Sequence, residues 1–589
     1  MPNLGRSFIF KLLRHLKNYV GWLLLAFVLL FGQAMCELAL PDYMSSLVSE
    51  GVAVGDMGFV WRRGLQMLLI SLGSVVCAVL VGLLAARIGS GVGRDLRSQV
   101  FNKVTSFSTP EFDRFSVSSL ITRSTNDITQ VQMFCTVLIR LVFYAPVMGV
   151  GGILRAAAKS SNMPGMVSTI AVSILIMLVL IGVLMAIVMP RFKRAQKLLD
   201  HLNLVARERL SGLMVIRAFN TEAHEEKRFD EANRNLTQNH LFVNRTISLM
   251  MPIMNLVMNG VSLVVVWIAA VSASNVADVG NMMAFMQYAL QIIMSFMMIS
   301  LVFVIMPRAS VSAGRIAEII DSPVEIQDPA HPQAVAANAP CTIQFDHVSF
   351  KYPGAEHDVL HDISFTARPG ETTAIIGSTG CGKSTLISLI PRLYDATQGK
   401  VSINGIDVKD FSQHDLHDLI SFVPQKGTLF SGTIASNIRY GNQEATDEQV
   451  RQFAQTAQAT EFIEEKPEGY DSPVSQGGGN VSGGQKQRLS IARALAKQAP
   501  ILIFDDSFSA LDFKTDAVLR RALNTTYQDR TMLIVAQRVS TIMNAQQIIV
   551  LDDGEIVGCG PHRELLKNCQ VYLEIARSQL SEEEIEHEQ

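Results

Sequence analysis

The sequence predicts a bundle of long membrane-spanning helices followed by a separate soluble domain of the α/β class. Three observations predict this fold. Residues 19 to about 306 are dominated by long apolar runs, residues 322–340 carry four prolines among small residues, and residues 341–570 look like an ordinary soluble domain. Because 589 residues exceed what one hydrophobic core usually supports, we expect at least two domains.

Composition excludes several classes of protein. The chain is 49% apolar with a mean hydropathy of +0.26, and its formal net charge of −3 gives no basic signal for nucleic acid. The seven cysteines are scattered, and none has the spacing of a metal site. We therefore expect a membrane protein with free cytosolic thiols, no disulfide framework and no nucleic-acid partner.

Six apolar runs are long enough to cross a bilayer of about 30 Å. We place the spans near residues 19–41, 65–90, 131–155, 165–190, 247–272 and 278–306. A basic start containing Arg6, Lys11 and Arg14 precedes the first run, so a secretory signal peptide is the alternative there. The length of the first run, Tyr19 to Leu40, favours a true span.

The distribution of Lys and Arg predicts the orientation. These residues gather at the N-terminus, between spans two and three, and between spans four and five, whereas the short link near 273–279 has none. A minority (Arg62, Arg63, Arg155, Lys159) falls on the outer side. We expect an integral protein of a bacterial plasma membrane, with both termini and the soluble domain in the cytoplasm.

The two long inner segments are amphipathic, and each contains a break in its helical pattern. The breaks lie in FDRFSVSSLITRSTNDI (112–128) and MVIRAFNTEAHEEKRF (214–229). A break at the tip of a long helical hairpin suits a short transverse helix that could dock on a second domain. A plain solvated loop is the alternative.

Two ionisable residues, Glu37 and Arg140, lie at membrane depth, where a charge is costly unless it faces a partner or a wet cavity. We favour a cavity or an interhelical pair over snorkelling for Arg140. The last two spans are rich in methionine, whose flexible thioether can adapt to many apolar shapes. Our candidates for a substrate cavity are Arg140, Met254, Met258, Met286 and Met294, and packing or lipid contact is the alternative for any single methionine.

The stretch IIGSTGCGKST (375–385) matches the pattern G-x-x-x-x-G-K-[ST] between an apolar strand, TTAIIG, and a helix, STLISLI. Backbone N–H groups at this helix start would cradle phosphates. Lys383 would reach the β- and γ-phosphates, and the Ser384 hydroxyl would bind Mg²⁺. The context of strand, loop and helix predicts a P-loop.

Two further stretches support a nucleotide site. NVSGGQKQRLSIARAL (480–495) places a glycine pair at a helix N-terminus, which makes a second anion site. ILIFDDSFSALD (501–512) is an apolar strand that runs into Asp505 and Asp506. In such sites the first acid holds a metal ion, and the next residue activates a water molecule.

These motifs resemble the ATP-binding cassette family over nearly the whole chain, with a membrane half of the six-span exporter type. The resemblance implies a six-helix membrane bundle (1–321), a linker (322–340), a cytosolic α/β P-loop nucleotide-binding domain (341–578) and an acidic tail (579–589), which is most simply a solvated helix end. It implies ATP and Mg²⁺ as cofactors and a head-to-tail dimer of nucleotide domains.

The resemblance also implies roles for individual residues. Tyr352 would stack on adenine. The phosphate loop would comprise Gly377, Ser378, Thr379, Gly380, Cys381, Gly382, Lys383, Ser384 and Thr385. Mg²⁺ would be held by Ser384, Gln425 and Asp505. The signature Ser482, Gly483, Gly484 and Gln485, with Asp512 of the D-loop, would act in trans on ATP bound to the partner.

The chain departs from the family pattern at three positions. Asp506 stands where the family has a catalytic glutamate, Gln537 stands where it has the switch histidine, and Gln476 replaces a glutamate before the signature. An Asp carboxylate ends about 1 Å short of a Glu carboxylate, and a misplacement of that size can cost roughly a hundredfold in rate. Gln537 cannot carry imidazolium charge. We expect this chain's own site to bind ATP and hydrolyse it slowly.

The expected function is that of one subunit of a heterodimeric, ATP-driven exporter of amphipathic small molecules, drug-like or lipid-like. Its partner would be a second, non-identical half-transporter with a competent Glu and His. Three alternatives stay open: a homodimer with two slow sites, a regulatory ATP-binding subunit that gates a partner, and an importer built on the exporter fold.

Overall fold

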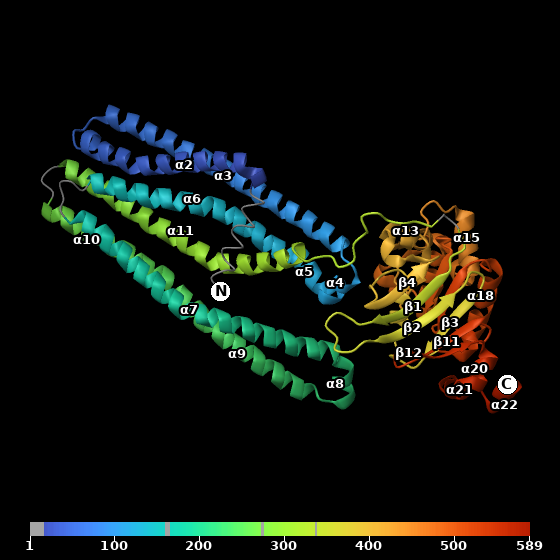
Figure 1. The fold of residues 1–589 in the computed structure, drawn as a ribbon. Helices are drawn as coiled ribbons and strands as arrows, with labels where there is room; N and C mark the ends of the chain where they lie inside the picture. The colour runs from blue at the N-terminus through green and yellow to red at the C-terminus, as the bar shows by residue number, and fades with distance from the viewer. Residues whose placement is uncertain (1–16, 160–164, 273–275, 336–338, 589) are drawn as a thin grey trace. The chain divides into compact units, whose positions relative to one another are not determined.

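The computed structural model describes residues 17–159, 165–272, 276–335 and 339–588, which form two compact units (Figure 1). The first unit comprises Met1–Thr105 and Val117–Ser322, and the second comprises Ser106–Ser116 and Pro323–Gln589. The basic residues Arg6, Lys11 and Arg14 and the link residues 273–275 lie outside the described residues.

The first unit is helical throughout its described length. Its long helices are α2 (Val20–Ser46), α3 (Met57–Thr105), α6 (Ile128–Lys159), α7 (Met166–Ser211), α9 (Glu222–Ser248), α10 (Met250–Ser272) and α11 (Val276–Ile320). The short helices α5 (Val117–Thr122) and α8 (Leu213–Phe219) lie between them. Among the described residues, six helical segments are long and apolar enough to cross a membrane, so the prediction of six spans is confirmed.

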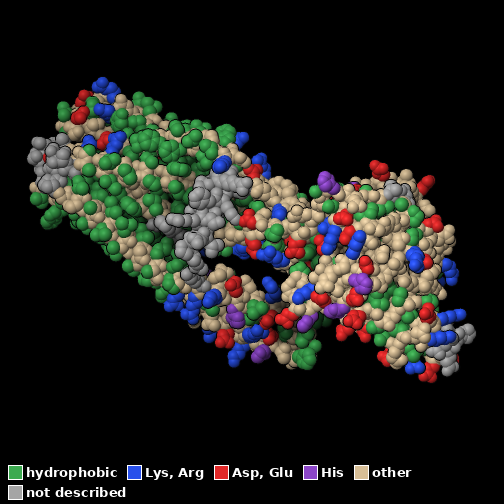
Figure 2. Space-filling model, viewed as in Figure 1, with side chains coloured by type: hydrophobic (Ala, Val, Ile, Leu, Met, Phe, Trp, Pro, Cys, Tyr) green, Lys and Arg blue, Asp and Glu red, His purple; other side chains and the backbone are tan. Residues whose placement is uncertain are grey.

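The long helices extend beyond a bilayer. Helix α3 has 49 residues, and at 1.5 Å per residue it is about 74 Å long, more than twice the thickness of the hydrocarbon core. Figure 2 shows hydrophobic side chains covering the surface of α2, α3 and α10, whereas charged side chains gather where α8 and α9 lie. The charged end suits water and the apolar part suits lipid.

Within this unit, α2, α3, α6 and α11 pack together, and α7 runs beside α9 and α10 (Figure 1). Glu37 on α2 joins three of these helices. Its carboxylate accepts hydrogen bonds from Gln33 (2.9 Å), from Ser74 on α3 (3.0 Å) and from the hydroxyl of Tyr144 on α6. Glu37 is thus satisfied by neutral donors and an interhelical network, which is how a carboxylate at membrane depth becomes tolerable.

The second unit contains two main sheets. Its strands are β1 (Ile343–Phe350), β2 (Leu360–Ala367), β3 (Thr372–Gly377), β4 (Gln398–Ile403), β5 (Ile406–Asp407), β6 (Ile420–Val423), β7 (Gly432–Thr433), β8 (Pro473–Val474), β9 (Ile501–Asp505), β10 (Thr531–Val535), β11 (Gln547–Asp552) and β12 (Glu555–Gly560). The antiparallel sheet has the order β2-β1-β4-β5, the six-stranded sheet has the order β12-β11-β3-β10-β9-β6, and β7 pairs with β8.

The helices of this unit connect and cover the strands. They are α4 (Thr109–Arg114), α12 (Lys383–Ser388), α13 (Gln413–Asp418), α14 (Ile434–Arg439), α15 (Asp447–Thr456), α16 (Thr460–Glu464), α17 (Gly483–Ala496), α18 (Phe513–Thr526), α19 (Val539–Ile542), α20 (His562–Asn568), α21 (Gln570–Arg577) and α22 (Glu582–Glu588). The predicted α/β class is confirmed.

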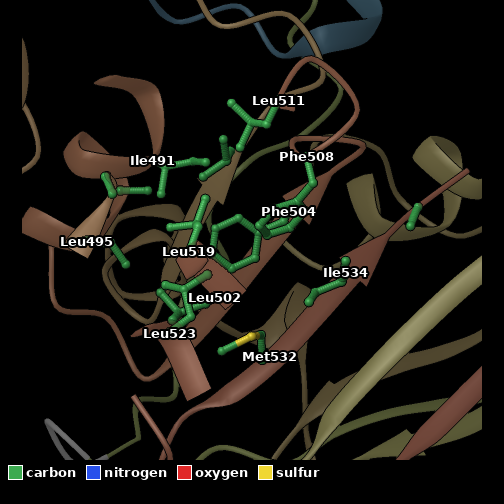
Figure 3. Close-up of a cluster of buried hydrophobic side chains, with 14 of the residues drawn as sticks. Ile491, Leu495, Leu502, Phe504, Phe508, Leu511, Leu519, Leu523, Met532 and Ile534 are labelled. Atoms are coloured by element: carbon green, nitrogen blue, oxygen red, sulfur yellow. The ribbon is translucent and has the colours of Figure 1, made fainter. Parts of the chain in front are cut away.

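Strand β9 is buried on both faces, which is why its sequence is a continuous apolar run. Ile501 and Ile503 join one hydrophobic cluster, and Leu502 and Phe504 join the other. Figure 3 shows Leu502 and Phe504 among side chains of α17 and α18. The packed strand therefore fixes the position of the two aspartates that follow Phe504.

Five strands of the larger sheet (β11, β3, β10, β9 and β6) run parallel. The carboxyl ends of parallel strands meet at one edge of a sheet, where ligands bind in this class of fold. The P-loop follows β3, Asp506 follows β9, Gln537 follows β10 and Gln425 follows β6. The topology thus brings four separate sequence stretches to one edge.

The short helix α4 belongs to the second unit, although its neighbours in sequence belong to the first. Glu111 is buried, and its carboxylate accepts hydrogen bonds from the Ser108 N–H (2.8 Å) and the Glu325 N–H (2.9 Å). The Tyr394 hydroxyl donates to Asp113. Short helices thus form at both predicted breaks: α4 and α5 at the first, and α8 at the second.

Candidate nucleotide-binding site

The P-loop joins β3 to α12 and crowds against β11, which explains its glycines. A Cβ on Gly377 would lie 2.0 Å from the Leu551 carbonyl oxygen, so no side chain fits there. Gly382 has a φ of 98°, in the left-handed region that glycine adopts without strain. The Lys383 ammonium reaches across the loop and donates to the carbonyl oxygens of Gly377 (2.9 Å) and Ser378 (2.6 Å).

The expected magnesium ligands lie together. The Ser384 hydroxyl donates to the Asp505 carboxylate at 2.9 Å. Burial raises the pKa of the Asp505 carboxyl above its usual value, and the hydrogen bond from Ser384 offsets only part of this rise. A hydroxyl and a carboxylate are hard oxygen donors that suit Mg²⁺, and bound Mg²⁺ would favour the ionised carboxylate. These residues therefore fit the cation that the P-loop pattern predicts.

Asp506 is buried, and one of its two carboxylate oxygens accepts hydrogen bonds from neighbouring side chains. Its Oδ2 accepts a hydrogen bond from the Gln537 amide (2.8 Å) and a second from the Gln425 amide (3.2 Å). Its backbone has a φ of 45°, which aspartate tolerates better than most residues, and its N–H donates to the Val535 carbonyl (3.0 Å). Because Gln425 uses its amide nitrogen here, its amide oxygen is the atom left for a metal.

Tyr352 lies beside the P-loop helix. Its hydroxyl shares a hydrogen bond with the Thr385 hydroxyl at 2.9 Å. Its ring meets Phe350 and Tyr394 edge-on, with ring centroids 4.9 Å and 5.3 Å away. Sequence reasoning missed Tyr394. It lies in RLYDA (392–396), and no local pattern connects this stretch to Phe350 of β1 or to Asp113, both of which Tyr394 contacts.

The signature residues cap α17. The Ser482 hydroxyl accepts from the Gln485 N–H (3.3 Å), and the Gln485 side chain accepts from the Ser482 N–H (3.2 Å). A Cβ on Gly483 would meet no heavy atom within 4 Å, so this backbone is open to approach. Asp512 caps α18, and hydrogen bonds from Thr515 lower the pKa of its carboxyl.

The structure divides the predicted site residues into two sets. Hydrogen bonds connect the P-loop with Tyr352 at one side and Asp505 at the other, and they connect Asp506 with both glutamines. Within the described part of the chain, the signature and Asp512 share no hydrogen bond with these residues. The candidates for a phosphate and magnesium site thus converge, whereas the signature stands apart.

Comparisons with known proteins identify the family of both parts of the chain. Residues 360–509 match the family ABC transporter, and residues 23–296 match the family ABC transporter transmembrane region. An uncharacterized ABC transporter ATP-binding protein of Mycobacterium tuberculosis is 40% identical over 574 residues, which cover 96% of this chain and 97% of that protein. An ATP-dependent lipid A-core flippase of Pseudomonas aeruginosa is 32% identical, with 95% and 94% covered.

A solved structure is similar over the same length. The structure of a bacterial Atm1-family ABC exporter with ATP bound has a TM-score of 0.79 and 25% identity, covering 96% of this chain and 99% of that one. The ATPase domain of the family binds ATP, generally with Mg²⁺, and couples its hydrolysis to transport. The protein is an integral membrane protein with a cytoplasmic nucleotide-binding domain. On this evidence the chain belongs to the ABC transporter family, as a half-transporter of the exporter type.

Proposed function

We propose that this chain is one half of a heterodimeric exporter in a bacterial plasma membrane, whose cargo is an amphipathic small molecule, drug-like or lipid-like. Its own site binds ATP and Mg²⁺ and turns over slowly, while its signature completes a competent site on the partner. The observation that carries the proposal is the Asp506 carboxylate, one oxygen of which accepts hydrogen bonds from two glutamine amides.

This arrangement makes Asp506 a poor general base for two reasons. A base must reach the proton that it removes, and an aspartate ends about 1 Å short of a glutamate at the same position. One oxygen is also already occupied by the amides of Gln425 and Gln537. Gln537 is neutral, so it cannot supply the positive charge that a protonated histidine would bring towards the γ-phosphate.

The parts of the site that bind nucleotide are intact, in contrast to the part that would activate water. Lys383, Ser384 and Asp505 are the residue types that a P-loop uses to bind ATP and Mg²⁺, and the contact between Ser384 and Asp505 supports a shared metal site. The signature is also intact, and Gly483 is open to approach. A good signature beside a poor catalytic carboxylate favours a partner chain that carries a glutamate and a histidine at these two positions.

A cavity of 320 Å³ in the helical unit supports an amphipathic cargo. Arg140 lies in it, and within the described residues its guanidinium has no hydrogen bond or ion pair. The other lining residues are mostly apolar: Leu30, Gln33, Ala78, Val81, Val137, Leu141, Tyr144 and Met298. The likeness to a lipid A-core flippase and to an Atm1-family exporter supports both a lipid-like cargo and the outward direction.

The four candidate methionines are placed differently from Arg140. Met254 is buried in the helix packing, Met258 and Met286 pack against the same cluster, and Met294 is exposed. Among the described residues that line the Arg140 cavity, the methionine is Met298. Arg140 is therefore the residue of the predicted set on which the cargo proposal rests.

Purification of the tagged chain from its native host tests the proposal. We expect a second, non-identical half-transporter to accompany it, with Glu and His aligned to Asp506 and Gln537. An isolated homodimer that hydrolyses ATP at full turnover would overturn the proposal. Stimulation of ATPase activity by amphipathic compounds distinguishes an exporter from a regulatory subunit, and the direction of transport in inverted vesicles distinguishes export from import.

A further inference from the structure

The C-terminal helices pack on the nucleotide-binding domain beside the loop that carries Gln537. Tyr572 and Ala576 are four residues apart and lie on one face of α21, and Leu580 follows the end of the helix, where its N–H donates to the Ala576 carbonyl at 2.8 Å. Tyr572 and Ala576 are fully buried, and Leu580 packs against the same hydrophobic cluster. This stripe anchors α21 and holds the polar residue that follows the helix, Gln579, at a fixed place.

The side-chain amide of Gln579 bonds the backbone on both sides of Arg538, directly after Gln537. It donates to the carbonyl oxygen of Gln537 at 2.9 Å, and it accepts from the N–H of Val539 at 2.8 Å. Val539 begins helix α19, whose preceding residue Arg538 provides no side-chain cap. Gln579 thus satisfies a helix-terminal N–H that would otherwise lack a protein partner.

A series of hydrogen bonds then leads from the end of the chain to the catalytic position. Gln579 fixes the backbone of Gln537, and the side chain of Gln537 donates to Asp506 at 2.8 Å. Asp506 follows the strand that ends in Asp505, which bonds Ser384 of the P-loop. The direction of the Gln537 side chain therefore depends on a residue that lies 42 positions later in the sequence.

We propose that Gln579 is a positioning residue for the ATP site: the C-terminal helix α21 holds the switch loop, residues 536–539, so that Gln537 stays directed at Asp506. The inference rests on the proposed function for the role of this site as the one that retains ATP. Without the Gln579 amide, the Gln537 carbonyl and the Val539 N–H would bond water instead, and the Gln537 side chain would sample other rotamers. ATP should then leave this site faster.

The expected size of the effect is that of one or two partly exposed hydrogen bonds. A single intramolecular hydrogen bond changes an equilibrium by roughly two- to tenfold. We therefore expect Gln579→Ala to increase the rate of ATP release by about that factor and to raise the KM for ATP, with little change in kcat. Gln579→Glu keeps an acceptor for the Val539 N–H but has no donor for Gln537, so its effect should be intermediate.

The first measurement is hydrogen exchange on the full-length protein in detergent, without nucleotide. Gln579→Ala should lower the protection of residues 536–540, and Gln579→Glu should retain protection at Val539. One matched control should behave as the wild type. Gln570→Ala removes an exposed glutamine of α21 whose side chain donates to Glu574 of the same helix.

The second measurement is the release rate of the fluorescent nucleotide MANT-ATP from the purified complex. A faster release in Gln579→Ala, with Gln579→Glu between it and the wild type, supports the inference. Unchanged protection of residues 536–540 in Gln579→Ala overturns it, as does a change in release no larger than that of Gln570→Ala. The exchange readout reports on residues 536–540 of this chain whatever its partner is, so a failure of the proposed heterodimer would be recognised separately.

Discussion

Replacement of Gly483 by aspartate and of Asp506 by asparagine should affect ATP hydrolysis very unequally. The structure makes both changes mild for the fold of this chain. A Cβ on Gly483 would meet no heavy atom within 4 Å, so the new side chain has room. In Asp506→Asn the new side chain has the size of the old one, and its amide oxygen can still accept a hydrogen bond from Gln537 or Gln425. Any loss of rate must therefore arise at the nucleotide.

The two magnitudes follow from the role of each residue. Loss of one preorganised donor to a transition-state oxyanion typically costs about 10²–10³ in rate, or about 2.7–4 kcal/mol. In the proposed dimer, Gly483→Asp adds a negative charge next to the γ-phosphate bound by the partner, so ATPase activity of the complex should nearly vanish. Asp506→Asn removes a base that is already short and occupied, so most activity should survive. Lys383→Ala should fall between them, because it weakens ATP binding at the site that we propose to be slow.

The assay is the ATPase rate at saturating ATP, with each variant paired with the wild-type partner. Gly483→Ala is the matched control for size without charge, and a melting temperature near that of the wild type confirms that each variant folds. If Asp506→Asn is as damaging as Gly483→Asp, this chain's own site is a true hydrolytic site. The interpretation of the two aspartates would then be wrong.

Three further predictions follow from single contacts. Arg140→Ala should change the range of compounds that stimulate ATPase activity, and Arg140→Lys should change it less. An Arg140→Leu variant with unchanged yield and transport would contradict a role for Arg140 in the cavity. Tyr394→Phe removes the hydrogen bond to Asp113 and should lower the free energy of unfolding of the second unit by about 1 kcal/mol; an unchanged melting temperature would contradict this. Gly377→Ala should abolish ATP binding and lower the free energy of unfolding of the domain by about 1–3 kcal/mol, because the new methyl group would clash with the Leu551 carbonyl. An affinity for ATP equal to that of the wild type, measured by calorimetry, would refute this steric argument.

Much of the fold was predictable because its signals are local. The apolar runs carry the spans, and the P-loop glycines lie between a strand and a helix as their pattern requires. The order of strand, loop and helix then places Lys383, Ser384 and Asp505 at one sheet edge, since parallel strands share a carboxyl edge. These residues depend on short-range pattern and on one general rule of topology.

The contacts that adjust the site were not predictable, because they join residues far apart in the sequence. Gln425 and Asp506 are 81 residues apart, and Gln537 and Gln579 are 42 apart. Glutamine in a loop has no pattern that indicates its partner. The assignment of α4 to the second unit has the same origin, because it depends on a buried bond between Glu111 and the backbone of Glu325, 214 residues away.

The network around Glu37 has a consequence for the order in which the membrane part is made. Tyr144 is synthesised 107 residues after Glu37, and Ser74 is synthesised 37 residues after it. The first helix must therefore enter the bilayer with only Gln33, one turn away on the same helix, as a donor to this carboxylate. An acidic residue in a span costs at most about 2.5–3.5 kcal/mol during insertion, the value for the centre of the helix, and the strongly apolar remainder of α2 offsets this cost. Until α3 and α6 are made, the Glu37 carboxylate lies in the bilayer with this one donor. Its bonds to Ser74 and Tyr144 then fix the positions of α3 and α6 against α2.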